Sequence, residues 1–493
     1  MLDGVLQPLI ANATSSIVIL SLTLLLAYLC YALFSHPLSH IPGPLHRRLS
    51  SIPLLVSNYR GTESSQAASL HAKYGPIVLL GPNDVHINDG GAIAPIYVEK
   101  GGFRKAPYYH STDIDGLQTI FSTTDPEYRA VRAKAVAPIF ATSKIQSDGA
   151  RILHDCADDF VAALKKAKNG VHEIDLIDLA RRYSLDAMSG YVFGKRYGAF
   201  TDYTGTETLS ATPYVNFIQA FTRFFLVPNW ILGYLLAFLG SVYPNQEFET
   251  STEKVTSYVQ SLVDEAKQGG GKDTFQKRLL DVGISEAETM VQCEDAIFAG
   301  TDAPGTTLGL LVWNLVKQPE YIRGLRHELT DGPMGNMSLL RATVQEGNRT
   351  SLANPVRLPR IVPPQGWTYT PSAGGKKSYH VPAGTAVGIS AYSLHLNETT
   401  FPSPHEFNPR RWVENGQSIA TREMNRDLFA FGAGSRQCIA QNLAMEEMFV
   451  VIRRLAESEV LTGAQVVCEE VRLGEWFNTR LRDGCNLKIR WTV

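Results

Sequence analysis

The chain of 493 residues lacks the features that mark several classes of protein. It has only six cysteines and no C-x-x-C pair, which argues for reduced thiols and against a disulfide framework. Its formal net charge is only -2, which gives no reason to expect nucleic acid as a partner. It contains neither an internal repeat nor a low-complexity segment. With 44% hydrophobic residues, this length predicts one large domain with a smaller lobe.

Basic residues are also absent ahead of the uncharged run Ile17 to Phe34, where only Asp3 carries charge. The run is near the lower limit of length for a membrane-spanning helix. Because Arg47 and Arg48 follow it, the positive-inside bias places residues after 35 in the cytosol and the N-terminus outside. A cleaved signal peptide is the alternative, and the missing basic segment argues against it.

Four segments follow from this pattern. We expect an outer, lumenal N-terminus at 1–16, a transmembrane anchor at 17–34, a proline-rich hinge at 35–50 and a globular domain at 51–493. The hinge includes Pro42-Gly43-Pro44, which cannot continue a helix and favours extended backbone. Asn12 begins a glycosylation sequon on the outer side, very close to the membrane.

Helical periodicity dominates the globular part, so we predict a mainly α fold with a small β region. The β region is expected around 66–104 and 357–392. Helices are expected at 125–145, 151–166, 173–195, 214–240, 286–316 and 319–330.

The most informative residue is Cys438, in the run Phe431 to Ala440. A cysteine ligates a metal as its thiolate. Arg436 adds a nearby positive charge, Gly434 permits a tight turn, and a helix is expected from 439, whose N-terminus favours negative charge. Phe431 can cover the proximal face of a metal. A buried structural cysteine beside a glycine turn is the other interpretation.

The pattern F-G-x-G-x-R-x-C-x-A resembles the ligand loop of the cytochrome P-450 family, the haem-thiolate monooxygenases. The resemblance implies that Cys438 is the axial ligand of the iron of haem b. It extends from about residue 40 to the C-terminus, as further motifs in the family's order indicate.

Glu346 and Arg349 form an E-x-x-R pair, which alone carries little weight. An F-x-P-x-R-W segment follows at 407–412, and in the family its arginine, here Arg411, joins that pair. The resemblance implies a structural role for these three residues, since a carboxylate held by two guanidinium groups would lock the core behind the cysteine loop. Asn348 stands where an apolar residue is usual.

The segment 299–307 resembles the oxygen-binding groove of the family, A-G-x-D/E-T-T. Gly300 and Asp302 match, which implies catalytic roles for both. The position of the alcohol is taken by Ala303, so either Thr306 or an ordered water replaces the hydroxyl, or proton delivery is altered. Thr306 lies four residues after Asp302, on the same expected helix face.

Haem propionates need cations. In the family one comes from a W/H-x-x-x-R pair, whose spacing Tyr128 and Arg132 share, and a second follows E-x-x-R, where Arg360 fits. Arg436 is the third candidate. Substrate contact is expected from the apolar stretch Phe217 to Phe238, which alternatively is plain core or dips into the membrane, and from the turn 475–479.

The resemblance implies a monooxygenase that inserts one oxygen atom of O₂ into a lipophilic small molecule. Its electrons come from NADPH through NADPH-cytochrome P-450 reductase, with cytochrome b5 as an optional partner, at the endoplasmic reticulum membrane. Short sequence segments along the chain resemble those of filamentous-fungal members of the family that act in secondary metabolism. This resemblance implies a polyketide, terpenoid or alkaloid intermediate as the substrate. Because Ala303 replaces an alcohol, a haem-thiolate isomerase or dehydratase is the alternative, and a haem-binding protein without turnover is another.

Overall fold

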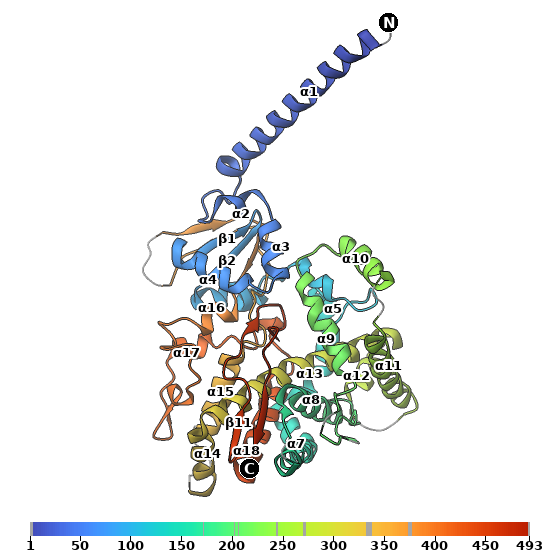
Figure 1. Ribbon diagram of the computed structural model, residues 1–493, viewed down its shortest axis with the longest axis vertical. Coiled ribbons are helices and arrows are strands. Elements are labelled where there is room, and N and C mark those ends of the chain that lie inside the picture. Colours follow the sequence, from blue (N-terminus) through green and yellow to red (C-terminus); the bar gives the residue numbers. More distant parts are fainter. Residues whose placement is uncertain are drawn as a thin grey trace.

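A computed structural model describes residues 3–491, apart from 171, 202, 206, 243–244, 270–272, 332–337 and 373–376. A helical body with small sheets carries one long N-terminal helix that projects away from it (Figure 1). This architecture confirms the predicted mainly α fold with a minor β region. The projecting helix α1 (Asp3–Cys30) continues as the π-helical turn η1 (Tyr31–Ser35). Within it, Ser15–Ser35 is long and apolar enough to cross a membrane.

The remaining helices have the following bounds: α2 (Leu45–Leu49), α3 (Ile52–Tyr59), α4 (Glu63–Tyr74), α5 (Pro126–Val136), α6 (Thr142–Lys144), α7 (Ala150–Gly170), α8 (Leu176–Val192), α9 (Thr212–Phe221), α10 (Asn229–Val242), α11 (Gln246–Lys267), α12 (Phe275–Asp281), α13 (Glu286–Lys317), α14 (Pro319–Asp331), α15 (Leu339–Ser351), α16 (Ala391–His395), α17 (Arg422–Asp427) and α18 (Gln441–Ser458). The strands are β1 (Ile77–Gly81), β2 (Asp84–Ile87), β3 (Arg104–Lys105), β4 (Ile174–Asp175), β5 (Arg360–Ile361), β6 (Trp367–Tyr369), β7 (Tyr379–Val381), β8 (Ala386–Gly388), β9 (Val413–Glu414), β10 (Gln417–Ser418), β11 (Ala464–Val466), β12 (Leu473–Gly474), β13 (Arg480–Leu481) and β14 (Lys488–Trp491).

The largest sheet has the order β1-β2-β8-β5-β3 and lies beside the base of α1 (Figure 1). Gly75 ends α4 with φ of 96°, which glycine adopts without steric cost, and the chain then enters the buried strand β1. β2 runs antiparallel to β1, with Ile77 opposite Ile87, and parallel to β8. This sheet joins segments that are far apart in sequence, because β5 and β8 come from the predicted strand region 357–392.

Helix α13 crosses the helical body and packs along α8, and both helices bury most of their side chains in the main core. The predicted glycine-proline interruption does not end the helix: Pro304 lies inside α13. The expected helix at 214–240 consists of two helices, α9 and α10. The segment between them includes a 3-10 turn at Thr222–Phe224 and Pro228, as the predicted break at Pro228 requires.

Candidate functional site

The Cys438 loop is closed by its own backbone. The Cys438 amide donates a hydrogen bond of 3.0 Å to the Phe431 carbonyl, and α18 begins at Gln441, just after the cysteine as predicted. Gly434 has φ of 72°, and a Cβ atom there would lie 1.8 Å from the carbonyl oxygen of Tyr97. The loop therefore lies so close to the backbone of Tyr97 that only glycine fits at this position.

Cys438 lines a hollow of the protein. Its side chain is accessible to solvent, yet burial among protein atoms raises the pKa of its thiol, which the amide of Ala440 opposes through a hydrogen bond. The hollow has a volume of about 490 Å³, is open to solvent, and lies between the loop and α5. Small side chains leave room on the α5 side: Ala130 and Ala133 of α5, and Ala137 directly after it.

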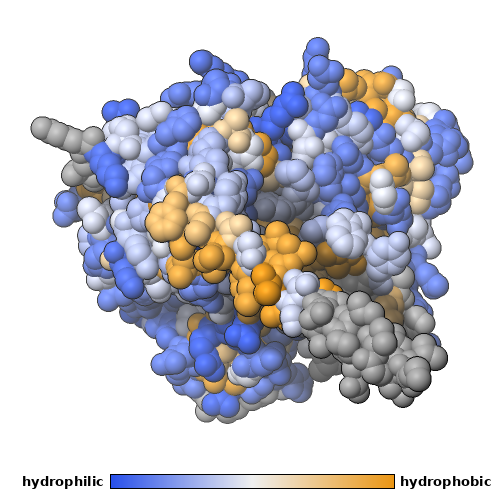
Figure 2. All heavy atoms as spheres, turned by 90° about the horizontal axis from the view of Figure 1, so that it is seen from above, coloured by the Kyte–Doolittle hydropathy of each residue, from blue (hydrophilic) through white to orange (hydrophobic). Residues whose placement is uncertain are grey.

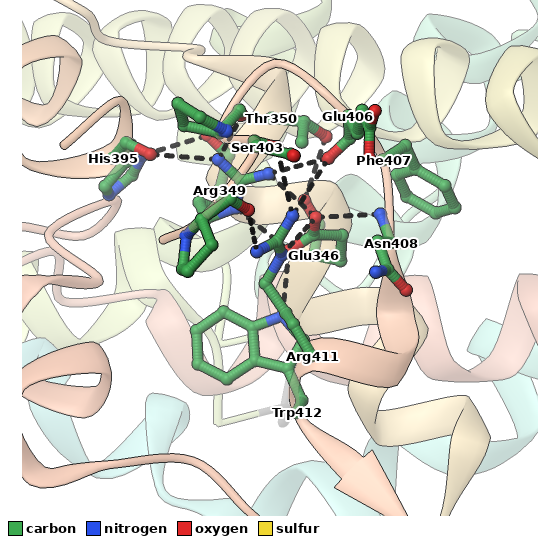
Figure 3. Close-up of polar contacts among 12 residues, drawn as sticks. Glu346, Arg349, Thr350, His395, Ser403, Glu406, Phe407, Asn408, Arg411 and Trp412 are labelled. Atoms are coloured by element: carbon green, nitrogen blue, oxygen red, sulfur yellow. Dashed lines mark hydrogen bonds and ion pairs between the residues drawn. The ribbon is translucent and has the colours of Figure 1, made fainter. Parts of the chain in front are cut away.

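Behind the loop, the fully buried Glu346 is the centre of a polar network (Figure 3). Arg349 donates to both of its carboxylate oxygens, over 2.9 and 2.7 Å. Arg411 donates to the same carboxylate over 3.0 Å, and the Trp412 indole N–H over 2.8 Å. The three residues predicted to meet here do meet. Trp412 and the amide of Asn408 are additional donors that the sequence motif did not indicate.

This network ties α15 to the segment that leads toward the cysteine loop. Arg349 also donates to the carbonyls of His395 and Pro404, over 2.9 and 2.6 Å. Buried charges of this kind are stable only when every donor and acceptor is satisfied, as is the case here. Asn348, the unusual residue of the motif, donates to the Val344 carbonyl and points toward the sulfur atoms of Met445 and Met448 of α18.

Four cationic side chains lie close enough to repel one another: Lys105, Arg129, Arg360 and Arg436. Burial, then Arg129 and Arg360, lowers the pKa of Arg436 to about 10. The pKa of Lys105 is lowered by burial and then by the three arginines. The Nη1 atom of Arg436 is buried and has no hydrogen-bond partner among the described residues. A bound anion would relieve the repulsion within this cluster, and the two carboxylates of a haem carry charge of the required sign.

Arg132 and Tyr128 were predicted to serve this anion, but the structure engages them elsewhere. Arg132 forms a two-point ion pair with Glu288 of α13, and the Tyr128 hydroxyl donates to the same carboxylate over 2.5 Å. Their charge is therefore already compensated. The sequence reasoning missed Arg129, which lines the hollow together with Cys438. The alanines at 130 and 133 of α5, with Ala137 directly after the helix, line the same hollow and were the available signal.

In α13, Asp302 forms an ion pair with Arg181 of α8. Asp302 is 1% exposed, and it accepts hydrogen bonds from Arg181 over 2.7 Å and Gln219 over 3.2 Å. Burial raises the pKa of this carboxyl, which Arg181 opposes. A Cβ at Gly300 would lie 2.8 Å from the side chain of Met188, so this glycine faces α8. The two matching residues of the predicted groove thus contact α8 and α9.

A different face of α13 is accessible. Ala299 is exposed and Ala303 partly so, although the helix crosses the interior, which indicates that this face borders an internal space. Thr306 lies one turn after Ala303 on this face, and its side chain is buried, with an exposed fraction of 5%. Thr306 therefore lies on the side of Ala303, and it does not share the contacts of Asp302 as its spacing suggested.

Comparison with known proteins decides the family. A sequence model of the family described as Cytochrome P450 matches residues 42–458. The chain belongs to the cytochrome P450 family. It is 34% identical over 499 residues to the cytochrome P450 monooxygenase mfmF of Annulohypoxylon moriforme, covering 97% of this chain and all of that protein. It is also 27% identical to the P450 monooxygenases astB of Aspergillus terreus and pbrB of Penicillium brasilianum, each over 87% of both chains.

This P450 is accordingly a monooxygenase of the oxidoreductase class, and its family holds haem iron through a cysteine thiolate. The two segments expected to contact substrate both reach Asp302. Gln219 lies near the start of the apolar stretch 217–238. Its side chain also donates a hydrogen bond of 2.7 Å to the carbonyl of Thr479 in the turn 475–479. The side chain of Asn478 hydrogen-bonds to Asp302 as well.

The apolar stretch of this P450 also reaches the surface. In α10, Trp230 is 72% exposed, Tyr234 79% and Phe238 63%. α10 lies at the end of the globular body from which α1 projects (Figure 1). Figure 2, seen from that end, shows exposed apolar side chains gathered there, including those of α1. The sequon at Asn12 lies where the side chains of α1 are not described.

Proposed function

We propose that this chain is a membrane-anchored haem-thiolate monooxygenase of fungal secondary metabolism. It inserts one oxygen atom of O₂ into a lipophilic intermediate, a polyketide, terpenoid or alkaloid. The observation that carries the proposal is that Cys438 and Arg129 line one hollow, and that Arg129 belongs to a cluster of cations with Lys105, Arg360 and Arg436. When bound, haem supplies the redox chemistry with oxygen.

In this proposal Cys438 ligates the iron of haem b, and Arg129, Arg360 and Arg436 bind the propionates. Phe431 covers the sulfur, and Gly434 lets the loop lie against Tyr97. Arg132 and Tyr128 support the site indirectly, because their hydrogen bonds to Glu288 fix α5 against α13. Glu346, Arg349 and Arg411 hold the backbone behind the loop in one conformation.

On the oxygen side, Thr306 is the side chain we propose to hold the proton-delivering water. It is one turn from Ala303, on the same face of α13. Asp302 in its ion pair positions this part of the helix, together with Gly300 against α8. The contacts of Asp302 argue against a direct role for its carboxylate in the resting structure.

Residues 17–34 are proposed to form an anchor that spans the endoplasmic reticulum membrane. Residues 1–16 then lie in the lumen, residues 35–50 form the hinge, and residues 51–493 form the cytosolic domain. The exposed rings of α10 support contact between the globular domain and the lipid surface. Electrons then come from NADPH-cytochrome P450 reductase on the cytosolic side, with cytochrome b5 as an optional second donor. Lipophilic substrates reach such an enzyme from the membrane.

Two measurements test this function. The ferrous CO complex of the full-length protein is expected to give the red-shifted Soret band of a thiolate ligand, which Cys438→His should abolish. Product formation from candidate intermediates, with NADPH and O₂ consumed in proportion, is expected from a monooxygenase. An isomerase or dehydratase, the alternative that Ala303 favours, would form product without consuming either.

Ala303→Thr separates two accounts of proton delivery. If the missing alcohol limits the enzyme, the variant should convert more of its NADPH into product and less into peroxide. Unchanged or poorer coupling would indicate that Thr306 or a water already serves.

A further inference from the structure

The accessible face of α13 carries one acidic residue that the proposed function leaves unused. Asp295, Ala299, Ala303 and Thr306 are separated by four, four and three positions, so they lie along one face of the helix. The opposite face packs against α8, where a Cβ at Gly305 would lie 2.7 Å from the side chain of Arg181. Asp295 therefore belongs to the face that borders the internal space.

Asp295 lies in a setting like that of Cys438: its side chain is partly accessible, yet protein surrounds it. Burial raises the pKa of its carboxyl to about 6, which a hydrogen bond from Thr119 and the charge of Lys105 oppose. Among the residues that the structure describes, none forms an ion pair with Asp295. A carboxylate so enclosed is stabilised most by a cation that approaches from the open side.

Lys105 does not fill this role, because its ammonium group is committed elsewhere. Its Nζ donates to the Phe121 carbonyl over 2.5 Å and lies 3.9 Å from the ring centre of Tyr109 and 4.1 Å from that of Phe121. It also belongs to the cationic cluster with Arg360 and Arg436. The ammonium group of Lys105 is thus held by two aromatic rings and a carbonyl, within the cationic cluster that we propose binds the haem propionates.

Aromatic rings form one side of this region. Tyr109, Phe121, Phe225 and Phe477 pack mutually, with ring centres 5.0 to 6.1 Å apart. Phe121 follows Thr119, which bonds Asp295, by two positions. Lys105, which lies 4.1 Å from the ring centre of Phe121, acts electrostatically on Asp295 and so links the carboxyl to these rings. A carboxylate without an ion-pair partner in an aromatic region has the chemistry that recognises an organic ammonium ion.

We propose that the substrate carries a protonated amine that pairs with Asp295, while its carbon skeleton lies along Ala299 and Ala303. The inference rests on the proposed function and narrows its substrate class to basic, nitrogen-containing lipophiles. The four-residue spacing places the ammonium one helical turn from Ala299 and two turns from Ala303. Asp295 thereby determines which part of the skeleton lies nearest Ala303.

Two matched probes test the pairing: N,N-dimethyl-4-phenylbutylamine and its uncharged carbon isostere, (5-methylhexyl)benzene. Their dissociation constants are measured by equilibrium dialysis with the full-length holoenzyme, after the ferrous CO band has been recorded. Asp295→Asn is expected to weaken binding of the amine by about 10- to 100-fold, the range for a charged hydrogen bond, and that of the isostere by less than about 3-fold. Asp295→Glu, which keeps the charge, should retain the preference for the amine.

Glu294→Gln is the matched control. Glu294 is also buried in α13, but it lies on another face of that helix and accepts a hydrogen bond from Thr256 of α11. The variant should change neither constant. Equal losses for the two probes in Asp295→Asn, or an unchanged amine constant, would overturn the role of Asp295. An absent thiolate band in the wild type would instead refute the proposed function, so the two failures are distinguishable.

Discussion

Arg181 of α8 donates a hydrogen bond of 2.7 Å to the carboxylate of Asp302 on α13, and both side chains are buried. The acid that the family motif assigns to proton delivery is therefore half of an ion pair. Because Gln219 of α9 bonds the same oxygen, these contacts join three helices: α8, α9 and α13.

Arg181→Met should leave Asp302 buried without its cation and lower the free energy of unfolding by about 3–5 kcal/mol. The pKa of Asp302 is already raised by burial, and loss of Arg181 should raise it further. The folded variant then binds a proton more tightly than the unfolded chain, so its deficit should shrink as pH falls. Urea unfolding against pH measures this. A double variant with Asp302→Asn should recover part of the loss; no recovery would contradict a pairwise role.

Glu346→Gln should also lower the free energy of unfolding by about 3–5 kcal/mol, because it leaves two arginines partly unpaired in the core. The exposed pair Arg453 and Glu457, four residues apart at 2.9 Å, provides the comparison. Arg453→Ala should cost less than about 1 kcal/mol. Urea midpoints of both variants give the answer, and similar small losses would mean that the buried network adds little stability.

Gly434→Ala should abolish the cysteine loop as it stands, because the new Cβ would overlap the Tyr97 carbonyl. Gly432→Ala is the control: its φ is 68°, but its Cβ would meet no atom nearer than 3.5 Å. It should cost only the strain of an unfavourable backbone conformation, on the order of 1–2 kcal/mol. Haem content per protein and the ferrous CO spectrum report both. A normal spectrum for Gly434→Ala would show that the loop can relax.

Arg129→Ala should weaken haem retention by about tenfold or more, because a charge-assisted hydrogen bond to a propionate is lost. Arg132→Ala should instead reduce thermal stability, since it frees Glu288 from its ion pair. Haem transfer to an excess of apomyoglobin measures retention separately from folding. Faster haem loss from the Arg132 variant than from the Arg129 variant would reverse our assignment.

The buried pair His71 and His86 predicts sensitivity to acid. His71 bonds the Gly75 carbonyl and His86, each over 2.7 Å, so the two rings cannot both be protonated on their facing nitrogens. Burial lowers the pKa of His71 to about 4 and that of His86 well below its usual value. As pH falls from about 6.5, the unfolded chain takes up protons that the folded chain refuses, so stability falls by about 1.4 kcal/mol per pH unit for each ring.

Urea unfolding between about pH 7 and pH 5 checks this slope. His71→Asn removes one titrating ring and should make the slope shallower by that amount. An identical slope in the variant would show that other groups cause the acid sensitivity.

Much of this protein was determined by local sequence. Gly75 after a helical pattern and the apolar run Ile77 to Leu80 that follows it specified the helix end and strand β1, because backbone freedom and local hydrophobicity act over a few residues. The same is true of Cys438, whose loop and following helix depend on neighbours within ten positions. Glu346 and its two arginines were predicted as a set, because their motifs fix both residue type and spacing.

Tertiary structure decided what those residues contact. Arg129 and Arg132 are three positions apart in one helix, and only the location of Glu288 on α13 separates the free cation from the paired one. Asp302 meets Arg181, which lies 121 positions earlier, and no local pattern encodes that meeting. Charge and helix phase can be read from sequence, whereas pairing depends on which surfaces pack together once the core forms.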